Sequence, residues 1–288
     1  MLKTESKTSI KTKLLILAIM FTNSNLFSYD EGIAKSGNIE IYYRDYGPAD
    51  GEPILLVQGI GGQLINWPQH LIEFLIEINF RPIVYDNRDT GLSSRIQNDS
   101  FNKDNVNKTI IRNYIRYYLR LPIKSEYTID DMADDGVSVL DHLNIENAHI
   151  LGISMGGMIA QIMASSYPEK TKTFTLIAST ASTPSPFNGP SKDVRRLFIE
   201  RTKNVDATIE DRVSRTKKLF KLIGYQGIDL DTQEFSDNVK LSIERGGVDD
   251  TGFGRQLTAI LGSKNRIEKV RSISAPTLII HGKEDPLI

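Results

Sequence analysis

The sequence contains no cysteine, one tryptophan and only four histidines in 288 residues. The absence of cysteine excludes disulfide bonds, thiolate metal ligands, a cysteine nucleophile and a lipid-modified N-terminal cysteine. Lysine and arginine number 35 against 36 aspartate and glutamate residues, which gives a net charge of −1. This balance produces none of the positive field typical of nucleic-acid-binding proteins, so we expect no nucleic-acid partner. The length suits one large α/β domain or two small ones.

Long hydrophobic runs are also absent. The apolar stretch near the N-terminus, residues 14–21, is far shorter than the roughly 20 residues that a membrane-spanning helix needs. Lysines precede it and polar residues follow it, which is the pattern of a secretory signal peptide. We therefore expect residues 1–28 to be a signal peptide and the mature protein to be periplasmic or secreted, with no stable membrane insertion. The alternative is an uncleaved anchor or a cytosolic tail.

The remaining chain alternates between strand and helix patterns. Short apolar or alternating runs predict strands, and segments with helical spacing of apolar residues lie between them. The predicted strands are 38–46, 53–58, 81–86, 148–153, 173–178 and 276–280, and the predicted helices are 67–78, 128–143 and 157–165. Thr128 is the expected cap of its helix. This alternation predicts an α/β fold with a doubly wound, mostly parallel sheet.

One predicted helix has a well-defined apolar face. In the helix 67–78 we expect the buried side chains to be Trp67, Leu71, Phe74, Leu75 and Ile78. A polar, largely helical stretch from about residue 193 to 272 later interrupts the alternation.

The strongest chemical signal is the pattern Gly-x-Ser-x-Gly at residues 152–156. It lies between a predicted buried strand and a predicted helix, where a sharp turn would expose Ser154 as a nucleophile. The small residues Gly152 and Gly156 allow the backbones to cross closely. The start of the helix would place the Met155 N–H beside a developing oxyanion. A phosphate-binding loop would place a lysine just after the glycines, and none follows.

Two further segments complete the predicted site. The glycine-rich loop after the strand 53–58 begins with Gly59, and the Ile60 N–H is the expected second oxyanion donor. A catalytic acid should follow the serine in the chain, at the end of a later strand. Asp285 stands at such a position after the strand 276–280, and the neighbouring Glu284 is the lesser candidate. The carboxyl edge of the sheet is where open α/β sheets place their sites.

Four segments, 57–67, 85–93, 151–157 and 276–285, resemble those of α/β-hydrolases. Within that superfamily they are similar to the group of aclacinomycin methylesterases and related small carboxylesterases. The run Arg88-Asp89-Thr90-Gly91 is the most group-specific match, although many relatives have Gly after the arginine, and Gln58 replaces a histidine found in many members. The resemblance implies a hydrolase core at 29–184, a helical cap at 185–271 and the rest of the core at 272–288. It also implies that Arg88 and Asp89 form a structural ion pair behind the site.

The base of the expected triad is the open question. In the family the catalytic histidine follows the acid after one more strand, whereas this sequence ends at Ile288. We therefore expect the last strand, its helix and the triad histidine to be missing, as in a truncated chain. We expect His142 and His149 to be packing or surface residues. The remaining two histidines, His70 near the expected oxyanion loop and His281 beside the acid, could replace the missing base. This is a weaker interpretation than a truncated chain, because the family order is serine, acid, histidine.

These patterns favour a serine hydrolase that cleaves a small-molecule carboxylic ester through an acyl-enzyme, with no metal or cofactor. Ser154 would attack, Ile60 and Met155 would bind the oxyanion, and Asp285 would orient the base. One alternative is an aminopeptidase of the proline-iminopeptidase type, which needs cap carboxylates for a substrate ammonium group. The available carboxylates are Glu200, Glu210, Asp211, Glu234 and Asp237. The other alternative is a non-catalytic or decayed hydrolase-fold protein.

Overall fold

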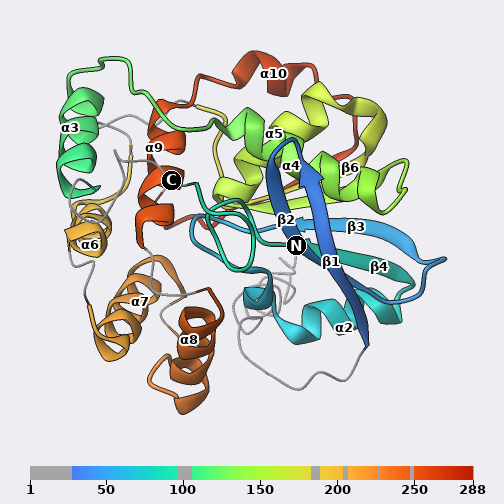
Figure 1. The fold of residues 1–288 in the computed structure, drawn as a ribbon, viewed down its shortest axis with the longest axis horizontal. Coiled ribbons are helices and arrows are strands. Elements are labelled where there is room, and N and C mark those ends of the chain that lie inside the picture. The colour runs from blue at the N-terminus through green and yellow to red at the C-terminus, as the bar shows by residue number, and fades with distance from the viewer. Residues whose placement is uncertain are drawn as a thin grey trace, which may run out of the picture.

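The computed structural model describes residues 28–96, 106–182, 189–203, 207–225, 227–246 and 250–287. The predicted signal peptide lies outside these residues except for Ser28. A single seven-stranded sheet has the order β1-β2-β4-β3-β5-β6-β7. The pairs β1–β2 and β2–β4 are antiparallel, and all pairs from β4 to β7 are parallel. The predicted doubly wound, mostly parallel sheet is confirmed (Figure 1).

The elements have the following bounds. The strands are β1 Tyr29–Ser36, β2 Ile39–Tyr46, β3 Glu52–Val57, β4 Phe80–Tyr85, β5 Ala148–Ile153, β6 Thr171–Ile177 and β7 Thr277–Ile280. The α-helices are α2 Gln69–Glu77, α3 Val106–Tyr118, α4 Ile129–His142, α5 Met155–Ser166, α6 Lys192–Lys203, α7 Ile209–Ile223, α8 Gln233–Gly246, α9 Asp250–Gly262 and α10 Ile267–Arg271. Two short 3₁₀ helices are η2 Leu64–Asn66 and η4 Pro168–Lys170.

The predicted strands all form, with ends that shift by at most two residues. Thr128 caps α4 as expected: its side chain accepts a hydrogen bond from the Asp131 N–H, and Asp131 bonds back to the Thr128 N–H. This reciprocal pair is a capping box. Two elements, β1 and α3, have no counterpart among the predicted ones.

The prediction for the helix 67–78 is wrong in its start and in part of its buried face. The α-helix begins at Gln69, because the chain enters it through η2 and then through Pro68 in an extended conformation. Trp67 and Leu75 are buried as expected, and Leu71 is partly buried. Phe74 and Ile78 are about half exposed, at 54% and 48%, whereas Ile72, which was not expected on this face, is buried.

The sheet has apolar layers on both faces. On one face α4 and α5 cover alternate side chains of the central strands, including Leu55, Val57 and Ile83. On the other face α2 and η2 cover the intervening side chains Leu56 and Val84. Buried parallel strands need this two-sided cover. The rigid sheet holds the carboxyl ends of β3, β5 and β7 at one edge, where the candidate site residues follow.

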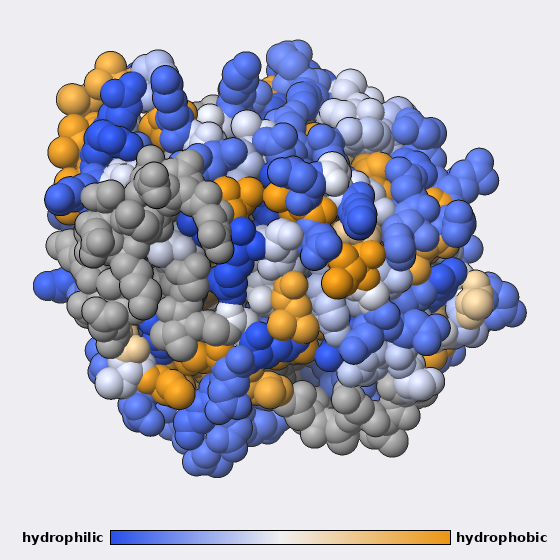
Figure 2. Space-filling model, in the orientation of Figure 1, coloured by the Kyte–Doolittle hydropathy of each residue, from blue (hydrophilic) through white to orange (hydrophobic). Residues whose placement is uncertain are grey.

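A helical insert, defined as α6 to α9, lies between β6 and β7 in the chain. Figure 1 shows it on the left of the view together with α3, beside the carboxyl edge of the sheet. Figure 2 shows that this side of the molecule is mostly hydrophilic, with apolar side chains in small separate patches. One patch lies at the upper left, over α3, where Ile111, Ile115 and Leu119 are exposed. In the part of the chain that the structure describes, no helix has both the length and the apolar character needed to cross a membrane.

Candidate active site

Ser154 lies at the turn between β5 and α5, where it is the residue before the first helical position. Its backbone has φ 55° and ψ −120°, a conformation that glycine adopts readily and other residues adopt only when their surroundings enforce it. The Ser154 N–H donates to Ile177 O at 2.9 Å, and the Ser179 hydroxyl donates to Ser154 O at 2.7 Å. These bonds from β6 and the loop after it hold the strained turn. The sequence pattern thus lies in the strand–turn–helix context that it predicts.

The two glycines of the pattern sit where the backbones cross most closely. A Cβ on Gly152 would lie 2.2 Å from Gly156 O, and a Cβ on Gly156 would lie 2.1 Å from Val57 O. Both distances are far below any tolerated contact, so a side chain at either position would push β5, α5 and β3 apart. The predicted supporting role of Gly152 and Gly156 therefore has a direct steric cause.

The loop after β3 reaches the serine. A Cβ on Gly59 would lie 3.2 Å from Ser154 Cβ and 3.7 Å from Ser154 Oγ. The segment forms a turn in which the Gly62 N–H donates to Gly59 O at 3.1 Å, and Gly61 has a φ of 68°. A positive φ at the third position is typical of a type II turn and favours glycine there.

The N–H groups of this loop are nearly all occupied. The Gly59 N–H donates to Gln58 Oε1 at 3.3 Å, and the Gly61 N–H donates to Gln256 Oε1 at 2.8 Å. Within the described chain, the Ile60 N–H has no acceptor. The Met155 N–H at the first position of α5 has none within its own helix, as at any helix start. The two predicted oxyanion donors are therefore the ones whose N–H groups are not used in the fold.

Asp285 lies in the turn that follows β7. Its side chain is mostly buried, with an exposed fraction of 12%, and Oδ2 lies 3.3 Å from Nε2 of His281. Oδ1 accepts the Leu287 N–H at 2.8 Å. Only β6 separates β5 from β7, so the strands that carry Ser154 and Asp285 lie about 10 Å apart. Glu284, the lesser candidate, is exposed.

The four histidines have different surroundings. His142 is exposed at the end of α4 beside the Tyr43 ring, and His149 contacts Glu52 and Thr173 at the start of β5. His70 is exposed near the start of α2. None of these three, nor His281, forms a hydrogen bond with Ser154 among the described contacts. His281 is the histidine that contacts the predicted acid.

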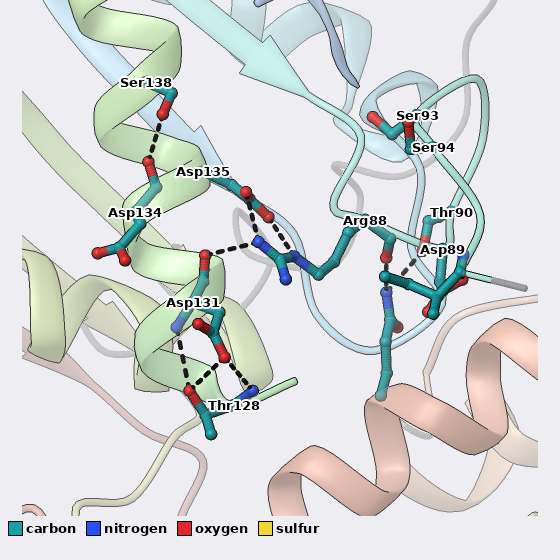
Figure 3. Close-up of polar contacts among 12 residues, drawn as sticks. Arg88, Asp89, Thr90, Ser93, Ser94, Thr128, Asp131, Asp134, Asp135 and Ser138 are labelled. Carbon is teal, nitrogen blue, oxygen red and sulfur yellow. Dashed lines mark hydrogen bonds and ion pairs between the residues drawn. The ribbon is translucent and has the colours of Figure 1, made fainter. Parts of the chain in front are cut away.

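The expected ion pair between Arg88 and Asp89 is wrong. Arg88 instead donates two hydrogen bonds to Asp135 of α4, at 2.6 and 2.7 Å, and one to Asp131 O (Figure 3). Asp89 accepts two from Arg255 of α9, at 2.8 and 2.7 Å. Asp89 has a φ of 67°, and neighbouring side chains in such a turn point apart. The turn therefore joins the core helix α4 to the helical insert.

A third buried carboxylate extends this network. Asp86, at the end of β4, accepts hydrogen bonds from the Leu64 N–H at 2.8 Å and the Leu92 N–H at 3.0 Å. Arg245 of α8 donates to it at 2.7 Å. Burial raises the pKa of the Asp86 carboxyl above its ordinary value, while Arg245 and the two N–H groups act in the opposite direction. The Asp86 carboxylate therefore links the edge of the sheet to the helical insert.

The insert also lines a small, partly open pocket of about 70 Å³ near the loop after β3. A Cβ on Gly61 would lie 3.1 Å from Phe253 and 3.4 Å from Arg201, two residues that line this pocket. The Arg201 guanidinium lies over the Phe253 ring, 4.0 Å from its centroid. The remaining lining residues are apolar or basic apart from one threonine: Leu197, Phe198, Arg212, Arg215, Thr216, Leu219 and Ile243.

Sequence reasoning missed the residues of the insert that contact the site loops. Gln256 and Arg255 contact segments more than 160 residues away in the chain. The one signal in the sequence is an Arg-Gln pair within a stretch of small and apolar residues, 251–262. Two adjacent polar residues on a helix that must be buried indicate fixed partners. The identity of those partners depends on the tertiary fold.

Comparison with known proteins agrees with this architecture. The model of the alpha/beta hydrolase fold family matches residues 52–288. Rhodomycin D methylesterase DnrP of Streptomyces peucetius is 25% identical over 282 residues, which cover 93% of this chain and 82% of that protein. The 3-oxoadipate enol-lactonase 2 of Acinetobacter baylyi is 23% identical, over 87% of this chain and 78% of that protein.

Solved structures show the same fold. A structure described among carboxylesterases of Nitrososphaera gargenis superposes with a TM-score of 0.64 at 22% identity, covering 90% of this chain and 82% of the other. The enol-lactonase of Burkholderia xenovorans superposes with a TM-score of 0.63 at 19% identity, covering 88% and 81%. The serine turn, the glycine loop after β3 and the sheet order are thus found together with a family match over most of the sequence. The chain belongs to the α/β-hydrolase fold family of hydrolytic enzymes, in a group similar to methylesterases and other esterase-like members.

Proposed function

We propose that the protein is a serine hydrolase that cleaves a carboxylic ester of a small molecule through an acyl-enzyme. The observation that carries this proposal is the strained turn at Ser154, with the Gly59 loop packed against its side chain. Strained backbone conformations of this kind cluster at active sites, where they position a reactive group. The methylesterase relatives support an ester as the substrate.

In the proposed reaction, Ser154 Oγ attacks the ester carbonyl and forms a tetrahedral intermediate. The Ile60 and Met155 N–H groups donate hydrogen bonds to its oxyanion. The serine proton passes to a histidine base that Asp285 orients, and the base returns it to the alcohol that leaves. Water then attacks the acyl-enzyme by the same route and releases the acid. His281 is the histidine that contacts Asp285, so it is the first base to test.

The pocket of the insert supports a small-molecule substrate. Ligand pockets combine apolar and aromatic side chains with a few polar groups, and this one combines five apolar residues with three arginines and a threonine. Two of its lining residues, Phe253 and Arg201, approach Gly61, so the pocket lies near the loop that carries the proposed oxyanion donor. We expect it to hold one of the two parts of the ester.

The aminopeptidase alternative has less support. The five carboxylates that it would use for a substrate ammonium group are all exposed. Asp211 caps its own helix α7, and Glu200 pairs with Arg196 on the surface. None of the five lines the pocket. A non-catalytic hydrolase fold remains an outcome of the experiment below.

The proposal is tested by intact-mass measurement of the purified protein before and after reaction with a fluorophosphonate probe. We expect one adduct that maps to Ser154. The Ser154→Ala variant should give no adduct, and Ser165→Ala, a serine later on α5, should react like the wild type. Denatured protein serves as a second control, since its serines lack an activating environment. A folded wild-type protein that forms no adduct would overturn the hydrolase proposal and favour the non-catalytic alternative.

Variants of the predicted acid and base follow once the adduct is seen. His281→Asn and Asp285→Asn should each slow labelling by a factor of about 10³ or more if these side chains serve Ser154, because triad members act as a unit. Labelling rates close to that of wild type would show that another group acts as the base. His142→Asn is the matched control, since His142 is exposed at the end of α4.

A further inference from the structure

The helical insert holds the oxyanion loop through one buried side chain, Gln256. Its Oε1 accepts the Gly61 N–H at 2.8 Å, although the two residues are 195 positions apart in the chain. Gln256 is 0% exposed and lies on α9. The bond therefore joins the insert directly to the loop that carries the predicted oxyanion donor.

Both N–H groups of the Gln256 amide also have partners. Its Nε2 donates to Arg88 O at 2.9 Å and to Thr90 Oγ1 at 2.7 Å. A carbonyl can only accept and a backbone N–H can only donate, so these partners fix which end of the amide faces each loop. Gln256 thus joins the oxyanion loop to the turn after β4, the turn seen beside α9 in Figure 3.

The bond to Gly61 fixes the peptide next to the predicted donor. Turns of this kind differ from one another by a flip of the central peptide, here the peptide between Ile60 and Gly61. An acceptor on the Gly61 N–H holds one orientation of that peptide. The neighbouring loop N–H groups are also occupied, and the Ile60 N–H is left for an incoming oxygen.

The support behind Gln256 is rigid. Arg255, the preceding residue, makes two hydrogen bonds to Asp89, and both side chains are buried. A Cβ on Gly252 would lie 2.4 Å from Asp89 O, so α9 packs directly on that turn. From α8, Ser242 Oγ accepts a hydrogen bond from Asn66 Nδ2 at 2.9 Å, just beyond the loop. Two helices of the insert therefore hold the segment that follows β3.

We infer that Gln256 is a positioning residue for the proposed reaction: it holds the Gly59–Gly62 turn so that the Ile60 N–H faces the oxyanion at Ser154. The inference rests on the proposed serine-hydrolase function. By this inference the helical insert positions a catalytic N–H group, in addition to any role in substrate binding.

Three variants test this role. Gln256→Met keeps the length of the side chain and removes all three hydrogen bonds. Gln256→Glu keeps an acceptor for the Gly61 N–H but loses the amide donor. Thr258→Val is the matched control, because Thr258 is equally buried on α9 and bonds only to Gly254 O and Asn113 among the described contacts. Each variant is compared with wild type by its thermal midpoint, its rate of fluorophosphonate labelling and its kcat and KM for p-nitrophenyl acetate.

We expect Gln256→Met to slow labelling and lower kcat by roughly tenfold to a hundredfold, since loss of one oxyanion donor costs about 10² to 10³ and here the donor is only displaced. KM should change little, because the oxyanion charge develops only on the way to the transition state. Gln256→Glu should retain more activity than Gln256→Met, and Thr258→Val should stay within about twofold of wild type. If Gln256 had a purely structural role, Gln256→Met would lower the thermal midpoint without lowering kcat at nearly constant KM.

Failure of the inference and failure of the proposed function give different results. If wild type is labelled at Ser154 and folded Gln256→Met is labelled at the same rate, the positioning role is overturned while the hydrolase function stands. If folded wild type is not labelled, the hydrolase function is overturned and the positioning role falls with it. Amide hydrogen exchange of the 59–62 segment checks the link itself: exchange at Gly61 should be faster in Gln256→Met and unchanged in Thr258→Val. Unchanged exchange in Gln256→Met would also overturn the inference.

Discussion

Ser154 occupies a backbone conformation, φ 55° and ψ −120°, that suits glycine better than serine. Such a residue costs about 1–3 kcal/mol in the folded state. We expect Ser154→Gly to abolish labelling by the fluorophosphonate and to raise the free energy of unfolding by about 1 kcal/mol, after the greater freedom of glycine in the unfolded chain is subtracted. The thermal midpoint should rise by about 2–4 °C.

Ser154→Ala is the control for this prediction. Alanine also lacks the hydroxyl, but its Cβ keeps the strain, so Ser154→Ala should be inactive without the same gain. Equal midpoints for the glycine and alanine variants would show that the turn stores little strain.

Tyr85 is a second residue whose surroundings set its behaviour. It is 0% exposed, and its hydroxyl has no hydrogen-bond partner among the described residues. Burial raises the pKa of Tyr85 well above its ordinary value of 10.0. The folded state therefore holds the phenol proton more tightly than the unfolded state. This contribution to stability is fully present below pH 10 and is lost as the pH rises through the higher folded value.

Replacing Tyr85 should flatten this pH dependence. We expect Tyr85→Phe to be about as stable as wild type near neutral pH, because it removes a buried group without a partner. Above pH 10 it should lose less stability than wild type. Urea unfolding on both sides of pH 10 measures the difference, with Tyr225→Phe as the control, since Tyr225 is 55% exposed. Parallel pH curves for Tyr85→Phe and wild type would contradict the prediction.

At the scale of elements, the ion pair between α9 and the turn after β4 is a strong structural link. Arg255 and Asp89 are both almost fully buried and share two hydrogen bonds. Removing one partner of such a pair leaves the other charge buried without compensation. We expect Arg255→Met to lower the free energy of unfolding by about 3–5 kcal/mol.

A double-mutant cycle isolates the pair. Asp89→Asn is a suitable second variant because asparagine tolerates the positive φ of 67° at this position. The double variant should be more stable than the sum of the single effects implies. The exposed pair Arg271–Glu268 is the control, and Arg271→Met should change stability by less than about 1 kcal/mol. Additive effects at Asp89 and Arg255 would argue against a coupled pair.

Elements with strong local patterns could be predicted from sequence. The strand Ala148–Ile153 and the turn at Ser154 follow from apolar patterning and two glycines, which are properties of neighbouring residues. The antiparallel strand β1 and the helix α3 were not predicted, although the apolar spacing of α3 is as marked as that of the predicted helices. The partners of Arg88 and Asp89 lie 47 and 166 residues away, so no local rule identifies them. Ile60 could be predicted because it follows the strand 53–58 closely in the sequence. Gln256 could not, because its contact with Gly61 joins positions 195 residues apart.

At the scale of the whole molecule, β7 is the most exposed part of the sheet. It stands last in the strand order among the described residues, and Leu278 and Ile279 are 55% and 65% exposed. Successive residues of a strand point to opposite faces, so both faces of β7 are open. Exposed apolar edge strands pair with other chains, and a net charge of −1 offers little repulsion against this.

We therefore expect a chain of residues 1–288 to self-associate as its concentration rises. Ile279→Lys should reduce this association, measured as the mean mass by light scattering over a concentration series. Phe74→Lys is the control: Phe74 is similarly exposed, at 54%, but lies on α2 away from the sheet edge. A wild-type protein that stays monomeric throughout the series would contradict the prediction.

The contact between Gln256 and Gly61 has a consequence for how this family can change. If the helical insert served only to bind substrate, it could be exchanged between relatives without regard to the loops of the sheet edge. Here α9 carries an acceptor for the oxyanion loop and donors for the turn at Arg88 and Thr90. A transplanted insert would have to bring that amide or be accompanied by a matching loop. Among homologues, substitutions at positions 90 and 256 should therefore occur together, because Thr90 contacts Gln256 through its side chain.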